Sequence, residues 1–159
     1  MSLRTEEIDL SKLNRLQGEA LGLFCWSDEH PLCGVAGFVD WRVCGKLSRV
    51  LLDRFFLAEP AEVILVPVGG RFGPRRLFLF GLGASRDFTP ARCTKVVRTA
   101  AEVIVRAGVS ELILGAAASR KHPEREAAFV RTAFEALGDR LSRVLVEKRP
   151  LESAALRSG

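Results

Sequence analysis

The stretch RRLFLFGLGASRDFTPARC, residues 75 to 93, contains the clearest structural pattern of the chain. A continuous apolar run ends in Gly-Leu-Gly, a short polar turn follows, and a second apolar pattern with helical spacing begins after Thr89-Pro90. Such a run is typical of a strand buried on both faces. Thr89 can cap a helix, and Pro90 fits the first helical position, where the N–H that proline lacks would have no partner. The stretch therefore predicts a strand over 76–82 and a helix over 90–107.

Short apolar runs alternate with helical periods along the rest of the chain. The loop GGRFGP joins two of the runs and is short enough for an antiparallel hairpin. Strands rich in Val, Ile, Leu and Phe, most of them separated by helices, predict an α/β domain with a mixed sheet covered on both faces. The other predicted strands are an edge strand at 3–10, buried strands at 20–26, 62–68 and 111–117, and a last strand at 143–147, and the other predicted helices are at 35–56 and 123–137.

The 159 residues are expected to form one domain over 1–150, followed by a loose tail over 151–159. The formal net charge is +5, but 19 Arg and 5 Lys are spread along the whole chain. This spread favours a solvated, arginine-biased surface over a dedicated nucleic-acid face. No apolar run reaches the roughly 18 residues that span a bilayer, so we expect no membrane partner. The N-terminus MSLRTEEIDL does not have the pattern of a signal peptide, which makes a cytoplasmic location the default expectation.

Four cysteines and two histidines do not have the spacing of a metal site, and none of the cysteines forms a C-x-x-C pair. Cys25 lies in an apolar run, and Cys44 and Cys93 lie in predicted helices, so we expect buried free thiols there, whereas Cys33 lies in a loop. The adjacent acids Asp28 and Glu29 have no recognisable catalytic partner. There is no H-E-x-x-H, G-x-S-x-G or Walker motif. We therefore predict no catalytic residue, no metal and no cofactor.

The segment Gly81-Leu82-Gly83-Ala84-Ser85 begins like a dinucleotide-binding fingerprint. Arg86 takes the place of the third glycine, and the helix cap comes several residues later, so the pyrophosphate geometry fails. The favoured interpretation is a strand-to-helix turn whose glycines permit positive φ angles. The alternative is an anion site made of backbone amides, with an arginine of this loop or of the glycine-rich loop 69–73 on the phosphate. The candidate ligand-binding residues are Gly81, Gly83, Ser85, Arg71 and Arg86.

Trp41 falls off the main apolar stripe of its predicted helix, next to the charged residues Asp40 and Arg42. Trp and Arg are enriched at the centres of protein interfaces, so Trp41 and Arg42 are candidate interface residues. The alternative is that Trp41 covers an edge of its own domain.

The order of several segments resembles the N-terminal domain of the cytosolic leucyl aminopeptidases, the M17 metallopeptidases. The resemblance covers roughly residues 18–137, and one hairpin strand reads much like the family's RLLLVGLG. It rests on ALGLFCWSDE, AGFVDWRVCGKLSRVL, EVILVPV, RRLFLFGLG, FTPARCTKVVRTAAEVIVRAG and ELILGAA.

This resemblance implies a macrodomain-like, three-layer α/β/α sandwich. In the family, the two metal ions and the catalytic Lys and Arg belong to a C-terminal domain with motifs such as NTDAEGRL. No such segment occurs in these 159 residues, so the resemblance brings neither aminopeptidase activity nor metal ligands to this chain. The family's N-terminal domain helps to organise a hexamer, and in some bacterial relatives it takes part in DNA binding. Macrodomains proper bind ADP-ribose, but the loop SDEHPLCG lacks their Asn motif.

The sequence therefore favours a non-catalytic module that binds a protein partner or associates with itself. One alternative is a module that binds a nucleotide or ADP-ribose, and another is a regulatory piece of an aminopeptidase. A third is a DNA-binding accessory protein that uses a basic helix face. The basic residues of that face are Arg92, Lys95, Arg98 and Arg106.

Overall fold

The computed structural model describes residues 2–115, 117–137, 141 and 143–147. Six strands form one mixed sheet in the order β1-β6-β5-β2-β4-β3. Only the pairing of β3 with β4 is antiparallel. The elements are β1 (Ser2–Glu6), α1 (Leu10–Leu13), β2 (Ala20–Trp26), α2 (Gly34–Arg42), α3 (Lys46–Leu52), β3 (Val63–Val66), β4 (Arg76–Gly83), the 3₁₀ helix η1 (Ser85–Asp87), α4 (Pro90–Arg106), β5 (Glu111–Leu114), α5 (Arg125–Leu137) and β6 (Arg143–Glu147).

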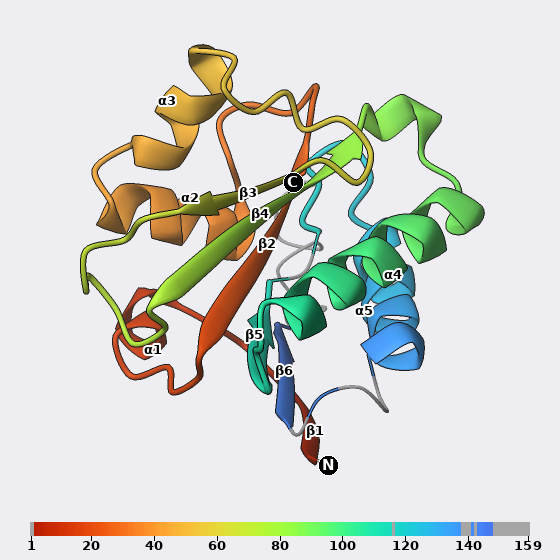
Figure 1. The fold of residues 1–159 in the computed structure, drawn as a ribbon. Helices are drawn as coiled ribbons and strands as arrows, with labels where there is room; N and C mark the ends of the chain where they lie inside the picture. The colour runs from red at the N-terminus through yellow and green to blue at the C-terminus, as the bar shows by residue number, and fades with distance from the viewer. Residues whose placement is uncertain (1, 116, 138–140, 142, 148–159) are drawn as a thin grey trace, which may run out of the picture.

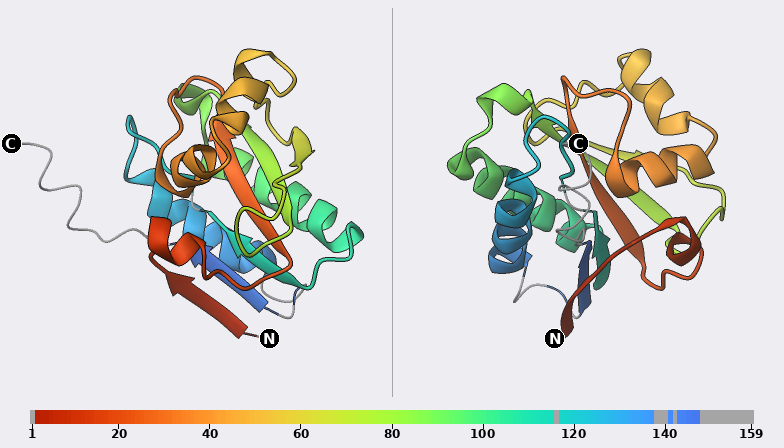
Figure 2. Two further views of the ribbon diagram at one scale, coloured as in Figure 1. Left: turned by 90° about the vertical axis from the view of Figure 1, so that its left-hand side faces the viewer. Right: turned by 180° about the vertical axis from the view of Figure 1, so that it is seen from behind.

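Helices cover both faces of the sheet, which confirms the predicted three-layer α/β/α sandwich. Helices α4 and α5 lie on one face, and α1, α2 and α3 lie on the other (Figures 1 and 2). Alternate residues of each central strand supply the two cores, because successive side chains of a strand point to opposite faces. Phe24 and Phe80 pack under α4 and α5, whereas Leu21, Leu79 and Ile113 pack under the other helices.

Residues 75–93 form the strand and the helix that their pattern predicts. Strand β4 lies between β2 and β3 and is buried along almost its whole length. Helix α4 begins at Pro90, and the side-chain oxygen of Thr89 accepts a 3.2 Å hydrogen bond from the backbone N–H of Arg92. Gly108 follows the helix with a φ of 71°. The capping and glycine signals read from the sequence therefore act as expected.

The single helix predicted over 35–56 is wrong, because the structure has two helices there. Cys44 and Gly45 both have positive φ angles, 57° and 75°, and these break the chain between α2 and α3. The prediction of a buried Cys44 thiol fails for the same reason, since the break exposes this cysteine, whereas Cys25 and Cys93 are buried as expected. Apolar spacing alone does not reveal the break, because both helices lie on the same face of the sheet.

The second strand is shorter and more exposed than predicted. The sequence predicts a buried strand over 62–68, but β3 covers Val63–Val66 and lies at an edge of the sheet. Its Leu65 side chain is 57% exposed. Pro67 follows the strand end, as expected of a residue that cannot donate a ladder hydrogen bond.

The remaining differences are changes of boundary. The strand predicted over 111–117 ends at Leu114, and the helix predicted from Pro123 begins at Arg125. The first strand covers 2–6 rather than 3–10 and lies at the sheet edge, next to β6. The predicted tail, 151–159, lies outside the described residues. In the part of the chain that is described, no helix is long and apolar enough to cross a lipid bilayer.

Candidate functional site

The carboxyl ends of the parallel strands β2, β4 and β5 meet at one edge of the sheet (Figure 1). Ligands of open α/β sheets bind outside this edge. The loops that follow these three strands contain Asp28 and Glu29, Ser85 and Arg86, and residues 117–124. The glycine-turn residues of the sequence hypothesis therefore lie in the region where a ligand would be expected.

Gly81 and Gly83 have a structural role at this edge. The Gly81 N–H donates to the Glu62 carbonyl at 2.8 Å, and the Gly83 N–H donates to the Ala58 carbonyl at 2.8 Å. A Cβ at Gly81 would overlap the Glu59 carbonyl oxygen, and one at Gly83 would lie 2.9 Å from Pro60 Cγ. Both amides are thus occupied, and both glycines allow residues 58–62 to pack against β4.

Ser85 binds the carboxylate of Asp28, a residue of the same domain. Its backbone N–H donates to Asp28 Oδ1 at 2.8 Å, and its hydroxyl donates to Asp28 Oδ2 at 2.9 Å. Lys121 Nζ lies 3.6 Å from Asp28 Oδ2. Burial by itself would raise the pKa of Asp28, but the two Ser85 hydrogen bonds and the Lys121 charge hold it below its ordinary value. The turn can bind a carboxylate, and Asp28 supplies it.

Glu29 forms the second half of the same network. Its side chain is buried and accepts from the Ser119 hydroxyl at 2.6 Å and from the Arg120 backbone N–H at 3.1 Å. Arg125 donates to the Ser85 carbonyl. These contacts tie the loop after β2 to the loops after β4 and β5, so both adjacent acids act as structural links in the described residues.

The two candidate arginines do not share a location. Arg86 lies beside Ser85, and its side chain is 83% exposed with Asp87 3.9 Å away. Arg71 lies in the loop between β3 and β4, at the opposite end of β4 from Ser85. Its guanidinium is 3.9 Å from Cys44 Sγ. The structure therefore brings Gly81, Gly83, Ser85 and Arg86 together and places Arg71 with the other candidate pair.

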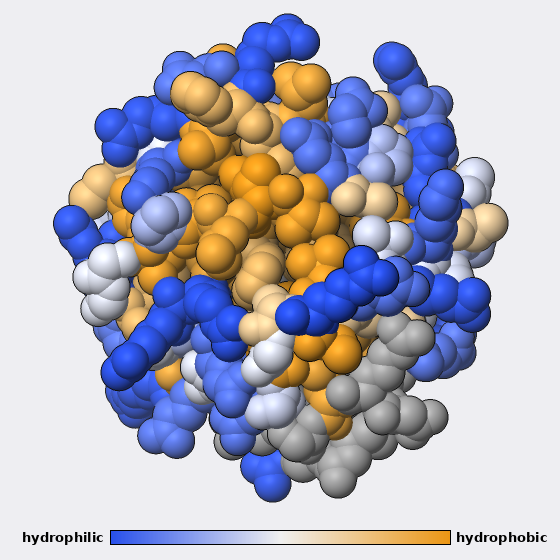
Figure 3. All heavy atoms as spheres, in the orientation of Figure 1, coloured by the Kyte–Doolittle hydropathy of each residue, from blue (hydrophilic) through white to orange (hydrophobic). Residues whose placement is uncertain are grey.

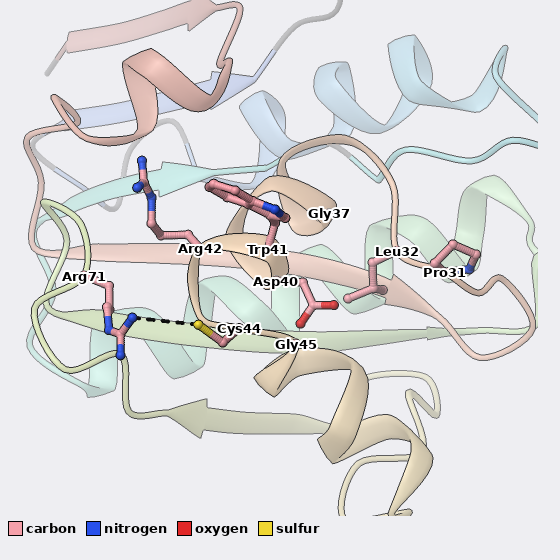
Figure 4. Close-up of a pocket in the computed structure, with 9 residues that line it drawn as sticks. All are labelled: Pro31, Leu32, Gly37, Asp40, Trp41, Arg42, Cys44, Gly45 and Arg71. Atoms are coloured by element: carbon pink, nitrogen blue, oxygen red, sulfur yellow. Dashed lines mark hydrogen bonds between the residues drawn. The ribbon is translucent and has the colours of Figure 1, made fainter.

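That other pair lines an open groove along α2, with a volume of about 860 Å³ (Figure 4). Trp41 is 68% exposed, so it does not cover an edge of its own domain. The Arg42 guanidinium lies 5.7 Å from the centroid of the Trp41 ring and donates to Asn14 Oδ1 at 2.5 Å. The groove extends from Pro31 and Leu32, before the helix, to Cys44, Gly45 and Arg71 beyond it.

Cationic side chains gather at the Cys44 end of this groove. Arg49 donates to the Cys44 carbonyl at 3.4 Å, Arg71 lies against the Cys44 thiol, and Lys46 donates to the Pro67 carbonyl at 2.8 Å. None of these cations, nor Arg42, has a carboxylate within ion-pair distance among the described residues. This end of the groove therefore carries uncompensated positive charge.

The groove has one acid of its own, Asp40, and that carboxylate is engaged. It accepts from the backbone N–H groups of Leu47 and Ser48, at 2.9 and 3.1 Å, and from the Ser48 hydroxyl. It thereby caps α3 from the neighbouring helix and directs its charge to that helix N-terminus. In the described residues Asp40 forms no ion pair with Arg42, which donates to Asn14, or with Arg71, which lies against Cys44.

A third surface corresponds to the DNA hypothesis. Lys95, Arg98 and Arg106 are exposed along α4, and Arg92 is half-buried near the start of that helix. Across the part of the chain that is described, no three or more His, Cys, Asp or Glu side chains are grouped so that they could hold a metal ion.

Comparison with known proteins identifies the family. The family model of the cytosol aminopeptidase family, N-terminal domain, matches residues 20–148, well over half of the chain. The chain belongs to this family. A comparison of this chain with curated protein sequences gives no match.

Solved structures share the fold of the domain. The macrodomain of Thermus aquaticus DarG matches with a TM-score of 0.68 at 14% identity, over 92% of this chain and 98% of that one. A mutant of tomato leucine aminopeptidase matches with a TM-score of 0.66 at 13% identity, over 99% of this chain and 35% of the enzyme. A Trypanosoma brucei macrodomain in complex with ADP-ribose gives 0.66 at 14% identity, over 96% and 66%. At these identities the likeness shows the fold, and the domain spans about a third of the tomato enzyme.

The sequence analysis names Trp41 and Arg42 as interface candidates and Arg71 as a ligand-binding candidate, and it does not predict that all three line one groove. Arg71 was associated with the glycine turn, although a hairpin loop before β4 must lie at the opposite end of that strand. The role of Asp28 was also missed. The signal was available, because an acid directly after a buried parallel strand lies at the edge where the loops of neighbouring strands meet.

Proposed function

We propose that the domain is a non-catalytic, cytoplasmic interaction module that binds a partner protein through the groove along α2. The observation that carries this proposal is the exposed Trp41 ring, with the Arg42 guanidinium over it, in the wall of an open groove. Tryptophan and arginine are the side chains most enriched among residues that dominate binding energy. An indole left in water has little structural use, whereas a partner that covers it gains its whole buried area.

The glycine turn supports a non-catalytic role less directly. Its amides hold the domain's own backbone and the Asp28 carboxylate, and Arg125 holds the Ser85 carbonyl. The polar groups of this network bond to one another and join the loops after β2, β4 and β5. The same loop after β2 continues to Pro31 and Leu32, which line the groove along α2.

The test compares proteins captured from an extract of the source cells by immobilised domain variants. Trp41→Ala removes the exposed ring and leaves the fold unchanged, which far-UV circular dichroism checks. Arg98→Ala is the matched control, because Arg98 is exposed on α4, on the other face of the sheet. We expect the wild-type and Arg98→Ala domains to retain the same partner and Trp41→Ala to lose it. Identical retention by all three would exclude the groove as the binding surface.

The same variants separate a foreign partner from self-association. Sedimentation of the purified domain over a range of concentrations measures its oligomeric state. If the wild-type domain forms a dimer that dissociates in Trp41→Ala, the partner is a second copy of the chain. If the wild-type domain is a monomer at all concentrations, the partner is a different protein.

A second candidate function is binding of ADP-ribose or another nucleotide at the glycine turn. It is favoured by the shared fold of the ADP-ribose-bound macrodomain and by the Ser85 N–H and hydroxyl, which hold a carboxylate in this domain. A phosphate would have to displace Asp28. A ligand present at about 100 times its dissociation constant raises stability by about 2.7 kcal/mol, which thermal denaturation detects. No shift with ADP-ribose or any nucleotide would remove this candidate.

A further inference from the structure

The groove along α2 has two chemically different parts. Gly37, Asp40 and Trp41 are spaced three and four residues apart and therefore follow one side of α2, and Cys44 lies in the break beyond the end of that helix. Towards the start of α2 the wall is apolar, with Pro31 and Leu32. Towards its end lie the cations around Cys44, with no ion-paired carboxylate in the described residues. A ligand that fits the whole groove must combine apolar and anionic groups.

We propose that the groove binds an extended acidic peptide segment of the partner, with carboxylates against Arg42, Arg49 and Arg71 and an apolar side chain on Trp41. This inference rests on the proposed function and names the partner's chemistry. Helix α2 has nine residues, roughly 14 Å at 1.5 Å per residue. An extended peptide of about six residues, at roughly 3.3 Å each, reaches from the apolar end to the cations.

Charge distribution favours a peptide over a nucleic acid. A nucleic-acid strand repeats its negative charge at every nucleotide and is matched by cations distributed along a groove. Here the cations gather at one end only, and the other end is apolar (Figure 4). Arg42 and Arg71 present guanidinium forks, which match carboxylates in planar, bidentate geometry. Asp40 does not compete for them, since α3 holds its carboxylate.

The experiment measures fluorescence anisotropy of three labelled probes with the full domain at low salt. The probes are a six-residue peptide of Glu and Asp with one central Phe, the same peptide with Lys in place of every acid, and a short single-stranded oligonucleotide. We expect the acidic peptide to bind at least about tenfold more tightly than the other two. Its binding should weaken as salt rises, because the Arg contacts are exposed. Equal or tighter binding of the basic peptide or of the oligonucleotide would overturn the proposal.

Variants locate the binding within the groove. Trp41→Ala should weaken binding of the acidic peptide about tenfold, and Arg98→Ala should leave it unchanged. Arg71→Glu should weaken the acidic peptide and strengthen the basic one, a reversal that general unfolding cannot produce. In a Cys33→Ser background, Cys44 is the exposed thiol of the described chain, and bound acidic peptide should slow its alkylation. Unchanged alkylation or no charge reversal would contradict the assignment of this groove.

The two proposals fail in distinguishable ways. If partner capture depends on Trp41 but acidic peptides do not bind, the groove is an interface and the acidic chemistry is wrong. If capture does not depend on Trp41, the proposed function itself is wrong, whatever the peptides do.

Discussion

Gly81 and Gly83 illustrate how one residue type can serve two purposes. In sequence they begin a phosphate-binding pattern, and in the structure their amides bond to the carbonyls of Glu62 and Ala58. The need for glycine differs between the two positions. Gly81 lacks a positive φ but leaves no room for a Cβ, whereas Gly83 has a φ of 76° and a Cβ there would lie 2.9 Å from Pro60. Close packing of residues 58–62 on β4 therefore explains this motif.

Alanine substitutions separate the two requirements. Gly81→Ala must displace the backbone of residues 58–62, so we expect it to lower the free energy of unfolding by about 3 kcal/mol or more. Gly108→Ala is the matched control, because its φ is 71° but its Cβ would meet nothing within 4 Å, and we expect about 1 kcal/mol. Urea denaturation measures both. Equal losses would show that packing at Gly81 relaxes easily.

Asp28 stabilises the domain in a pH-dependent way. Asp28→Ala leaves the Ser85 N–H and hydroxyl without their acceptor, so we expect a loss of about 1–3 kcal/mol at pH 7. The pKa of Asp28 is lowered from 3.8 in the folded domain, so its stabilisation is present above 3.8 and disappears as pH falls through the lower folded-state pKa. The difference between wild type and Asp28→Ala in urea denaturation should therefore shrink towards pH 3. Asp87→Ala, at a 57% exposed side chain of the same loop, is the control and should change little at either pH.

At the scale of elements, the break between α2 and α3 shapes the candidate groove. Cys44 and Gly45 adopt positive φ angles, and Asp40 of α2 caps the N-terminus of α3. One uninterrupted helix would have no end at Cys44 for the cations to surround. The Asp40 capping contact joins α2 directly to the first turn of α3.

Removal of this cap should loosen α3 first. Asp40→Ala deprives Leu47 and Ser48 of their acceptor, and we expect a loss of about 2 kcal/mol in the free energy of unfolding. Hydrogen exchange should speed up at these two amides before it does in β4. Asp53→Ala, at the exposed residue after α3, should have little effect in both measurements. Unchanged exchange at Leu47 in Asp40→Ala would mean that packing alone holds α3.

At the scale of the whole molecule, strand β3 leaves one edge of the sheet open. The Gly81 N–H donates to the Glu62 carbonyl, and antiparallel ladders bond alternate residues, so the backbone groups of Val63 and Leu65 point away from β4. Hydrophobic side chains gather over this region in the space-filling view (Figure 3). The exposed large hydrophobic residues around β3 and in the segment before it are Leu52, Phe55, Leu57 and Leu65. An open apolar edge of this kind promotes pairing with other chains.

A charge on this edge should suppress such pairing. Leu65→Lys introduces a cation at a 57% exposed position, so the free energy of unfolding should change by less than about 0.5 kcal/mol. Light scattering at high protein concentration should fall relative to wild type. Val105→Lys is the control, because it removes an exposed apolar side chain of α4 without touching the edge. An equal decrease in both variants would point to general surface hydrophobicity.

Local patterns of the sequence predict the layered α/β fold, most of its strands, and helix α4 with its cap, because apolar periodicity, Thr89-Pro90 and Gly108 act over a few neighbouring residues. The sequence also marked Trp41 and Arg42 as candidate interface residues. Tertiary structure alone decided that Arg71 lies with Cys44 and Arg49, that Asp28 occupies Ser85, and that Asp40 ends one helix pattern by capping another. These contacts join residues that are distant in the chain. Their energies depend on how the strands and helices pack, and local sequence patterns carry no information about that packing.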